Sequence, residues 1–321
     1  MRAALLRGPG DLRVEEVPDP APLAGEVLVR IEAATTCGTD VKIWRRGHPL
    51  VTTYPARLGH EMVGEIVAVG PEVTSLGAGE RVLVGDSVAC GRCRSCALGR
   101  PQICSEPQWI FGGFAELMVA PEAALHAIPE GLEPAAAAMA EPLAAAVHAL
   151  ARAPARQVAP DVGVLGGGPM GQMLAALLVA DGRTVTLADR HAERRAQAEA
   201  AGAASAERLA DHDVVFEAVG RPDAWREAVQ ACASGGCVVF VGGCKAGTDA
   251  SLPTRPLHYE ELDLRGAFHH APEEVDRALA LLAKGALDWR ALAAGPIGLD
   301  DLAQALATGN QGPARKWVVM P

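Results

Sequence analysis

Four of the eight cysteines lie within fifteen residues, at a spacing that suits a metal ion. They are Cys90, Cys93, Cys96 and Cys104, in the pattern C-x2-C-x2-C-x7-C. Four thiolates spaced in this way can enclose one tetrahedral zinc ion. An iron–sulfur cluster fits less well, because the last gap is seven residues and Ser105, not proline, follows. Unrelated buried thiols are the third interpretation, which the regular spacing disfavours. A closed four-cysteine site has no open position, so we expect it to stabilise a loop and the chemistry to lie elsewhere.

Further cysteine, histidine and glutamate residues suit a second metal. Cys37 lies in ATTCGTD, His60 and Glu61 lie in LGHE, and Glu141 lies in AEP. A catalytic zinc takes three protein ligands and leaves one position for water or substrate, and Cys37 and His60 are of the right type. Other interpretations stay open: a buried thiol, a hydrogen-bonded histidine, a solvated acid and, for Glu141 before Pro142, an acid favoured by a helix dipole.

A glycine-rich turn is the third candidate site. Gly166, Gly168 and Gly171 are spaced G-x-G-x-x-G, between an apolar strand expected at 162–165 and an apolar helix expected to run through residue 178. Between strand and helix this motif is typical of dinucleotide binding, because the glycines let backbone N–H groups approach a pyrophosphate at the helix N-terminus. A tight turn without a ligand is the alternative.

Residues around this turn bear on the choice of nicotinamide cofactor. Pro169 and Met170 lie inside the motif, and a second strand expected at 184–187 leads to Asp189. Asp189 would accept hydrogen bonds from the adenosine ribose and repel a 2′-phosphate, so we predict NAD rather than NADP. Arg190 favours the opposite, since a neighbouring arginine can accommodate that phosphate.

The elements that must position these residues alternate regularly in the second half of the chain. Further strands are expected at 213–216 and 237–241, and helices at 192–201 and 222–233. This alternation predicts a parallel, doubly wound sheet.

Composition limits the class of protein. With 321 residues, half of them hydrophobic, the chain is long enough for two domains. The net charge of −10, without a basic stripe, argues against nucleic acid as a partner. No run of about eighteen apolar residues and no signal-peptide core occurs, so we predict a soluble cytoplasmic protein with no membrane partner. Three cysteines lack ligand spacing and are expected in the core or in loops: Cys232, Cys237 and Cys244.

Taken together, these motifs resemble the zinc-dependent medium-chain dehydrogenase/reductase family of alcohol and polyol dehydrogenases. The resemblance covers nearly the whole chain and rests on CGTD at 37–40, GHE at 59–61, the four-cysteine loop, GGFAE at 112–116, AEP at 140–142, GGGPMG at 166–171 and ARKWVVMP at 314–321. It implies an α/β protein. A GroES-like β-rich catalytic domain, residues 1–145 and 269–321, would be interrupted by a Rossmann cofactor domain with a doubly wound parallel sheet, residues 146–268.

The resemblance also implies roles for the candidate ligands. Cys37 and His60 would hold a catalytic zinc, with Glu61 as a ligand or as a residue that exchanges onto the metal. Glu141 matches a glutamate of the sorbitol- and threonine-dehydrogenase-like branch, to which the sequence is similar because it lacks a second cysteine at that position. With the four-cysteine site, this implies two zinc ions per chain.

Residues near Cys37 would handle the proton. Thr39 would take the proton of the substrate hydroxyl, and Asp40 would orient the zinc ligands through hydrogen bonds. The family often has a relay histidine where this sequence has Lys42, so the proton would leave through Lys42, through His48 or directly to solvent.

The segments 104–112 and 203–213 are shorter than is usual in the family. The first lies near the expected substrate site, which implies a wider or differently covered pocket. His269 and His270, in GAFHH, lie at a strand end that would meet the nicotinamide, and we expect them beside the zinc ligands rather than among them. Three aromatic side chains are candidates for the pocket wall or for ordinary core packing: Trp44, Trp109 and Phe111.

The implied function is reversible oxidation of a polyol or other secondary alcohol by hydride transfer to NAD. An amino-alcohol dehydrogenase of the threonine or aminocyclitol type is one alternative. A non-catalytic, zinc-stapled nucleotide-binding protein is the alternative from another class, and it is disfavoured because Cys37, His60 and Glu141 are all present. The resemblance further implies a homodimer or homotetramer.

Overall fold

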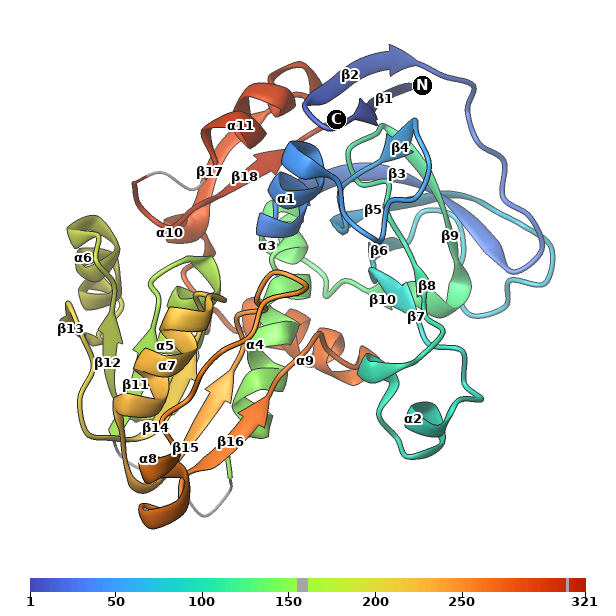
Figure 1. Cartoon of the computed structure of the whole chain (residues 1–321). Helices are drawn as coiled ribbons and strands as arrows, with labels where there is room; N and C mark the ends of the chain where they lie inside the picture. The colour runs from blue at the N-terminus through green and yellow to red at the C-terminus, as the bar shows by residue number, and fades with distance from the viewer. Residues whose placement is uncertain (155–160, 310–311) are drawn as a thin grey trace.

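A six-stranded parallel sheet forms the middle of the chain in the computed structural model, which describes residues 1–154, 161–309 and 312–321 (Figure 1). Its strands lie in the order β13-β12-β11-β14-β15-β16, and every adjacent pair is parallel. This is the strand order of a doubly wound dinucleotide-binding sheet, so the predicted sheet is confirmed. The strands are β11 (Asp161–Leu165), β12 (Thr184–Ala188), β13 (Ala204–Ala206), β14 (His212–Glu217), β15 (Cys232–Phe240) and β16 (Asp263–Gly266).

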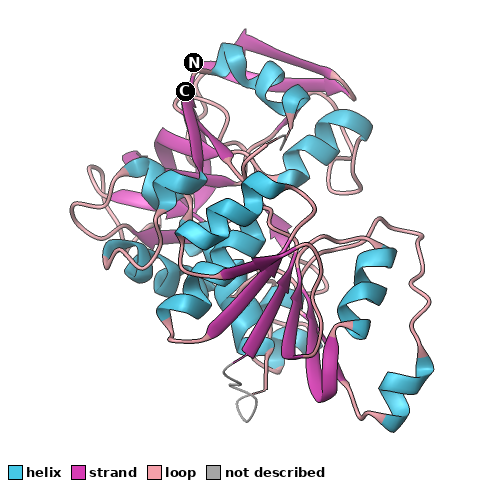
Figure 2. Ribbon diagram, turned by 90° about the vertical axis from the view of Figure 1, so that its left-hand side faces the viewer, coloured by secondary structure: helices cyan, strands magenta, loops and turns pink. Residues whose placement is uncertain are grey.

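Both faces of this sheet are apolar, because its strands are covered by helices on either side. Val214 and Phe216 pack against α4 (Ala140–Arg152), α5 (Pro169–Ala180) and α9 (Pro272–Ala283), whereas Val215, between them, packs against α7 (Pro222–Gln230). Figure 2 shows the strands fanned between these layers of helices. The helix expected at 222–233 is shorter in the structure because β15 already begins at Cys232.

A second, mixed sheet of seven strands joins the two ends of the chain. Its order is β10-β6-β5-β3-β18-β17, and β9 also pairs with β3. The last strand, β18 (Lys316–Val319), lies antiparallel beside β3 (Glu26–Thr35), so the C-terminus completes a sheet that the N-terminal residues begin. The other strands are β5 (Glu61–Val69), β6 (Arg81–Val84), β9 (Leu117–Pro121), β10 (Leu125–Ala127) and β17 (Ala293–Ile297).

The β-rich part and the parallel sheet together confirm the predicted α/β fold class. The predicted domain boundaries at 145/146 and 268/269 stay predictions, and α4 runs continuously across the first.

Short elements complete the molecule. A three-stranded sheet has the order β2-β1-β4, and β7 pairs with β8. Among the described residues, none of the helices combines the length and apolar character needed to cross a bilayer. The remaining elements are β1 (Arg2–Gly8), β2 (Asp11–Glu16), β4 (Ala56–Arg57), β7 (Ser87–Val88), β8 (Gln108–Trp109), α1 (Gly38–Arg46), α2 (Arg94–Ala97), α3 (Pro134–Ala138), α6 (Ala192–Ala200), α8 (Thr254–Tyr259), α10 (Trp289–Leu292), α11 (Leu302–Thr308) and the 3-10 turns η1 (Pro101–Ile103), η2 (Glu122–Ala124) and η4 (Leu299–Asp301).

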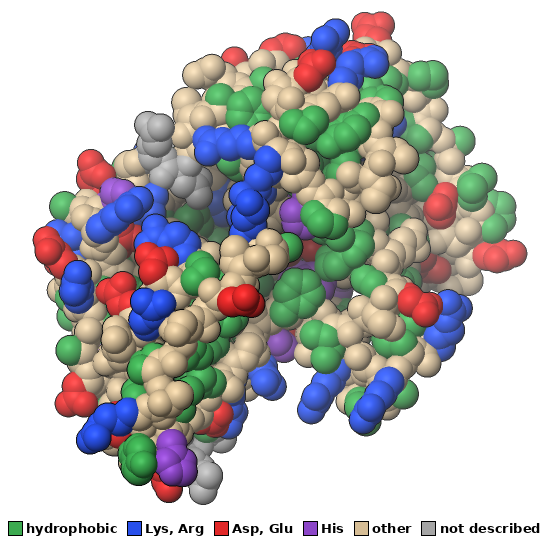
Figure 3. Space-filling view, in the orientation of Figure 1, with side chains coloured by type: hydrophobic (Ala, Val, Ile, Leu, Met, Phe, Trp, Pro, Cys, Tyr) green, Lys and Arg blue, Asp and Glu red, His purple; other side chains and the backbone are tan. Residues whose placement is uncertain are grey.

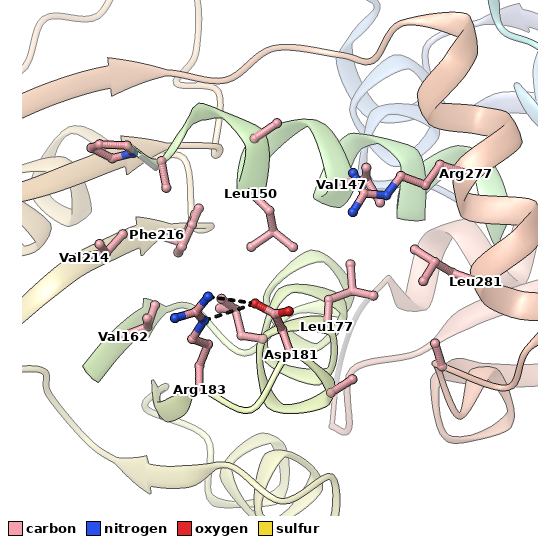
Figure 4. A pocket seen from close by; sticks show the side chains of 16 residues that line it. Val147, Leu150, Val162, Leu177, Asp181, Arg183, Val214, Phe216, Arg277 and Leu281 are labelled. Atoms are coloured by element: carbon pink, nitrogen blue, oxygen red, sulfur yellow. Dashed lines mark hydrogen bonds and ion pairs between the residues drawn. The ribbon is translucent and has the colours of Figure 1, made fainter. Parts of the chain in front are cut away.

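An apolar pocket of about 570 Å³ lies between α4, α5 and α9 (Figure 4). Leu150, Leu177 and Phe216 line it, and an ion pair between Asp181 and Arg183 lies beside it, with 3.0 Å between Oδ2 and the guanidinium. The pocket is at the amino edge of the parallel sheet, whereas cofactors of doubly wound folds bind at the carboxyl edge. Among the residues that line it, none is a predicted site residue.

Candidate active site

The four-cysteine loop folds into a small lobe built from α2 and η1. The four sulfur atoms lie within 4.8 Å of one another, with 3.5 Å between the Sγ atoms of Cys93 and Cys96 and 3.8 Å between those of Cys93 and Cys104. Four sulfurs arranged tetrahedrally at the usual zinc–sulfur distance are about 3.8 Å apart. Backbone N–H groups of Cys90 and Glu106 donate to Cys104 Sγ over 3.3 Å each. The donor set and its spacing therefore fit a structural zinc.

Cys37, His60 and Glu61 meet at one end of the seven-stranded sheet. Their ligand atoms lie within 4.8 Å of one another, and His60 and Glu61 are buried. Cys37 precedes α1, while Glu61 begins β5 in register with Thr35 of β3. Gly59 makes the approach possible: it has φ +84°, and a Cβ there would lie 2.9 Å from the backbone nitrogen of Phe114. One thiol, one imidazole and one carboxylate fit a zinc with an open fourth position.

Asp40 holds this group from behind. Its Oδ2 accepts a hydrogen bond from the backbone N–H of Cys37 over 2.8 Å, and its Oδ1 lies 3.5 Å from His60 Nδ1. Burial opposes the charged form of His60, but Asp40 outweighs this effect and raises the pKa of His60. These contacts agree with the orienting role predicted for Asp40.

Glu61 has a cationic partner that the sequence analysis missed. Lys316 Nζ, 5 % exposed, donates to Glu61 Oε1 over 2.7 Å, and Thr35 Oγ1 donates to Oε2. Burial alone would raise the pKa of Cys37, but Lys316 and His60 bring it down to about 7. Burial also raises the pKa of Glu61, against the pull of Lys316. Lys316 lies within the ARKWVVMP motif, but nothing near it in the sequence indicates that its partner is Glu61.

Glu141 lies in a neighbouring group rather than among the ligand atoms of Cys37, His60 and Glu61. It begins α4 and is grouped with Asp86, His269 and His270, whose ligand atoms all lie within 4.8 Å of one another. His270 Nε2 is 3.2 Å from Glu141 Oε1. The sequence analysis kept the two histidines outside the ligand sets and did not consider Asp86.

Burial and charge set the protonation of this neighbouring group. Burial would raise the pKa of Glu141, but the hydrogen bond and charge of His270 bring it down to about 2. Burial, aided by the charge of Glu141, raises the pKa of Asp86 to about 7. Burial lowers the pKa of His269 to about 4. The two carboxyl groups thus differ strongly in acidity although they share one cluster.

The residues predicted to move the proton and line the pocket are placed as follows. Thr39 is half-buried in the first turn of α1, Lys42 is exposed, and His48 is half-buried with a pKa lowered by burial and by Lys42. Phe111 meets the ring of His60 edge-on at 5.8 Å, and Trp109 lies 5.3 Å from the ring of His269. Trp44, in contrast, packs against the core of the β-rich part.

The glycine turn joins β11 to α5 in a geometry that only glycine permits. Gly166 has φ +103°, and a Cβ on Gly171 would lie 1.8 Å from the carbonyl oxygen of Gly166. Pro169 and Met170 form the first turn of α5. The strand end and the helix N-terminus therefore lie close together. The backbone N–H groups of the first helical turn are then available to bind a pyrophosphate.

Asp189, at the end of β12, is tied to this turn. Its Oδ2 accepts from the N–H of Gly167 over 2.8 Å, and its Oδ1 accepts from the N–H of His191 over 2.8 Å. Arg194 lies 3.7 Å from Oδ2, and Arg190 is exposed. The acid that would favour NAD and the arginines that would favour the 2′-phosphate of NADP are thus both present near this turn.

The group of Asp86, Glu141, His269 and His270 lies at the carboxyl edge of the parallel sheet, because His269 and His270 follow the end of β16. The charge of Glu141 acts on Glu61, so the group of Cys37, His60 and Glu61 lies near it. Figure 3 shows a hollow between the two parts of the molecule, with histidine side chains within it. A glycine turn, a hollow and a cysteine–histidine–glutamate group with a half-buried thiol together define a zinc- and nucleotide-dependent oxidoreductase.

Comparison with known proteins leads to the same class. Residues 23–130 match the alcohol dehydrogenase GroES-like domain, and residues 169–284 match the zinc-binding dehydrogenase domain. The chain belongs to the zinc-dependent medium-chain alcohol dehydrogenase family. The predicted family is therefore confirmed, and the non-catalytic alternative falls away.

Individual relatives are similar over almost their whole length. L-galactonate-5-dehydrogenase of Escherichia coli K12 is 33 % identical over 89 % of this chain and 88 % of its own. L-threonine 3-dehydrogenase of Sinorhizobium medicae is 32 % identical over 94 % of both chains. A structure from Sinorhizobium meliloti 1021, described as a zinc-binding dehydrogenase bound to NADP, has a TM-score of 0.93 and 30 % identity and covers 100 % of this chain and 99 % of its own.

Proposed function

We propose that this dehydrogenase oxidises a polyol or other secondary alcohol reversibly, with NAD as hydride acceptor and two zinc ions per chain. The observation that carries the proposal is the group of Cys37, His60 and Glu61 beside the carboxyl edge of the cofactor sheet, in which the histidine and glutamate are buried and the thiol is half-buried. Cys37, His60 and Glu61 would hold the catalytic zinc, with Glu141 nearby, and Cys90, Cys93, Cys96 and Cys104 would hold the structural one.

The two cofactors would supply the reactive chemistry. Zinc in this position is a Lewis acid that lowers the pKa of an alcohol. The nicotinamide accepts the hydride, and the protein supplies its orientation.

The chain's own residues would bind, orient and move a proton. Asp40 fixes the ring of His60, and Lys316 balances the charge of Glu61. Thr39, two residues from Cys37, would take the hydroxyl proton and pass it to solvent past Lys42 or His48. Phe111, beside the ring of His60, and Trp109, beside the ring of His269, would exclude water from the reacting carbon.

NAD is favoured over NADP by Asp189, whose carboxylate at the end of β12 would face the adenosine ribose. Arg194, 3.7 Å from Asp189 Oδ2, and the exposed Arg190 would favour NADP instead. Because the similar structure from Sinorhizobium meliloti is bound to NADP, the assay below compares NADP with NAD.

An amino-alcohol such as L-threonine is the second candidate substrate class. Threonine dehydrogenases are among the similar proteins, and the acidic pair of Asp86 and Glu141 would attract an ammonium group. A polyhydroxylated acid is a further candidate substrate, because one of the similar proteins is an L-galactonate dehydrogenase.

The experiment is an absorbance assay of reduced nicotinamide with NAD and NADP in parallel, over polyols, sugar acids, simple secondary alcohols and L-threonine. We expect turnover with one class, abolished by Cys37→Ser and retained by Cys244→Ser, a half-buried thiol outside both metal groups. Activity that survives Cys37→Ser would overturn the proposed zinc site. Silence of a protein with zinc and NAD bound would overturn the proposed substrate classes.

We also propose a cytoplasmic homodimer or homotetramer. All eight cysteines are free, as a reducing compartment favours, and β16 ends the parallel sheet with an open edge that could pair with a second copy. Light scattering of the purified protein tests the assembly: a monomer would contradict it.

A further inference from the structure

Asp189, the acid predicted to bind the adenosine ribose, is covered by the side chain two residues after it. His191 Nδ1 lies 2.7 Å from Asp189 Oδ1, and the backbone N–H of His191 donates to the same oxygen over 2.8 Å. The side chain of Asp189 is only 8 % exposed, whereas that of His191 is 37 % exposed. The imidazole, rather than the acid, is therefore the group that the surface presents at this position.

Asp189 is ionised beneath this imidazole. Burial alone would raise the pKa of Asp189, but the N–H donors of His191 and Gly167 and the charge of Arg194 hold it below its usual value. An ionised carboxylate only accepts hydrogen bonds, so Nδ1 of His191 carries a hydrogen and donates it to Oδ1. The contact is thus a hydrogen bond to a charged group, which is stronger than one between neutral groups.

Most of the acceptor capacity of Asp189 is used within the protein. A carboxylate offers about four lone-pair directions. The two contacts of His191 take both directions of Oδ1, and the N–H of Gly167, at 2.8 Å, takes one of Oδ2. The adenosine ribose of NAD offers two neighbouring hydroxyl groups, which is more than the remaining direction can accept. To accept from both hydroxyl groups, Asp189 must release the imidazole of His191.

The backbone donors cannot make room in place of the imidazole. Gly167 is wedged into the turn: a Cβ there would lie 3.2 Å from Asp189 Cβ and 3.1 Å from Arg194 Cβ. The N–H of His191 is fixed as well, because this residue is the N-cap of α6. Only the imidazole can turn about its own side-chain bonds, so it is the adjustable contact of Asp189.

The charges around Asp189 reduce its repulsion of a phosphate. Arg194 lies 3.7 Å from Oδ2, and Arg195 donates to the backbone oxygen of Asp189 over 2.8 Å. Arg190 is exposed, and Arg195 also faces Glu207, whose side chain is 81 % exposed, over 3.7 Å. A carboxylate that already receives an imidazole and faces a guanidinium repels an approaching anion less than a bare carboxylate does.

We propose that His191 sets the margin by which this protein prefers NAD to NADP. Its imidazole keeps Oδ1 of Asp189 from the ribose hydroxyl groups of NAD and separates the carboxylate from the 2′-phosphate of NADP. NAD remains the better ligand by a small margin, and NADP binds as well. The inference rests on the proposed function, because it needs a nicotinamide cofactor on the glycine turn. His191 acts on the choice of cofactor and has no part in hydride transfer.

Fluorescence titration of the zinc-loaded protein with NADH and with NADPH tests this, because the two ligands differ only in the 2′-phosphate. The quantity compared is the Kd of NADPH divided by the Kd of NADH. We expect a ratio below roughly ten for the wild type and a ratio at least roughly tenfold higher for His191→Leu, since the freed carboxylate binds the ribose and repels the phosphate. A larger wild-type ratio, or a ratio for His191→Leu close to that of the wild type, would overturn the proposal.

His191→Asn keeps the hydrogen bond while it removes the ring. Its amide nitrogen can stand where Nδ1 stands, and asparagine suits the N-cap of α6. We expect its ratio to stay near that of the wild type, as should the ratio of His258→Leu, an exposed histidine beside Tyr259 on α8. A ratio for His191→Asn as high as that for His191→Leu would overturn the role of the hydrogen bond.

The same titration separates this inference from the proposed function. Dinucleotide binding by the wild type with a ratio that ignores position 191 would contradict the inference alone. Binding of neither NADH nor NADPH by the wild type would overturn the proposed function, and the inference with it.

Discussion

At the scale of single residues, the buried pair of Lys316 and Glu61 stands behind the candidate zinc site. The lysine brings a positive charge next to an acid and a thiol that are themselves predicted ligands. A buried pair is not in itself a large source of stability, but removing one partner strands the other charge in a low-dielectric environment. Lys316 is therefore a residue whose loss affects both the fold and the site.

Lys316→Met should lower the free energy of unfolding by about 3–5 kcal/mol, because Glu61 then lacks its cation. Urea denaturation of the variant measures this loss. The control is Lys245→Met, an exposed lysine. The double variant Lys316→Met/Glu61→Gln should recover part of the loss. Equal stability of Lys316→Met and the control Lys245→Met would contradict the prediction.

Much of the site could be predicted because its members carry local signals. A short stretch of sequence is enough to identify each of several motifs: the four cysteines, the motifs around Cys37 and His60, and the glycine turn. The contacts of Lys316 and Asp86 could not be predicted, although Lys316 lies in the ARKWVVMP motif, because their partners are distant in sequence: Lys316 and Glu61 are 255 residues apart. Contacts of this kind appear only when the order of strands is known.

At the scale of elements, β11, β12, β14 and the later part of β15 were predictable because each is a short apolar run near glycine or a charged residue, whereas β13 (ASA) and β16 (DLRG) are not such runs and were not predicted. The start of β15 was not: the structure begins it at Cys232, in a stretch expected to end a helix. Pairing of Cys232 with His212 on β14 outweighs the local helix preference. The joining of β18 to β3 likewise depends on tertiary pairing alone.

The turn after β14 depends on one acid, Glu217. This buried side chain accepts hydrogen bonds from the N–H groups of Val219 and Gly220 over 2.8 Å each. Burial nevertheless raises its pKa to about 7. Because the folded-state pKa is above the unfolded value, the acid contributes its full stability below about pH 4.5 and loses it as the pH rises through 7.

Glu217→Gln should therefore make the protein less sensitive to pH. Relative to this variant, the wild type is expected to lose up to about 3 kcal/mol of unfolding free energy between pH 5 and pH 8. Parallel urea denaturation curves at the two pH values measure the difference. Identical pH dependence of the two proteins would mean that Glu217 is already ionised in the native state.

At the scale of the whole molecule, the four-cysteine lobe is held differently from everything else. It projects from the β-rich part (Figure 1), and neither α2 nor η1 has a buried residue. Leu98 and Ile103 are 61 % and 44 % exposed. Without apolar burial, such a small segment needs a metal to stay folded.

Cys104→Ser should therefore unfold the lobe while the two sheets stay intact. Limited trypsin digestion is expected to cut the variant after Arg92 or Arg94, at least tenfold faster than the wild type, with little change in circular dichroism. Cys244→Ser, outside the lobe, is the control. A lobe that resists trypsin as well as the wild type would show that it is held by protein contacts alone.

The place of β18 also has a consequence for how the protein is made. Thr35 and Ala34 of β3 pair with Val318 and Val319, and Glu61 pairs with Lys316, so these early residues find their partners only after residues 316–319 have been synthesised. The parallel sheet can form on the ribosome while the end of β3 is still an open edge, which is the kind of surface that chaperones cover. The group of Cys37, His60 and Glu61 thus acquires its buried lysine only after residues 316–319 have been synthesised, and a product that stops before them lacks it.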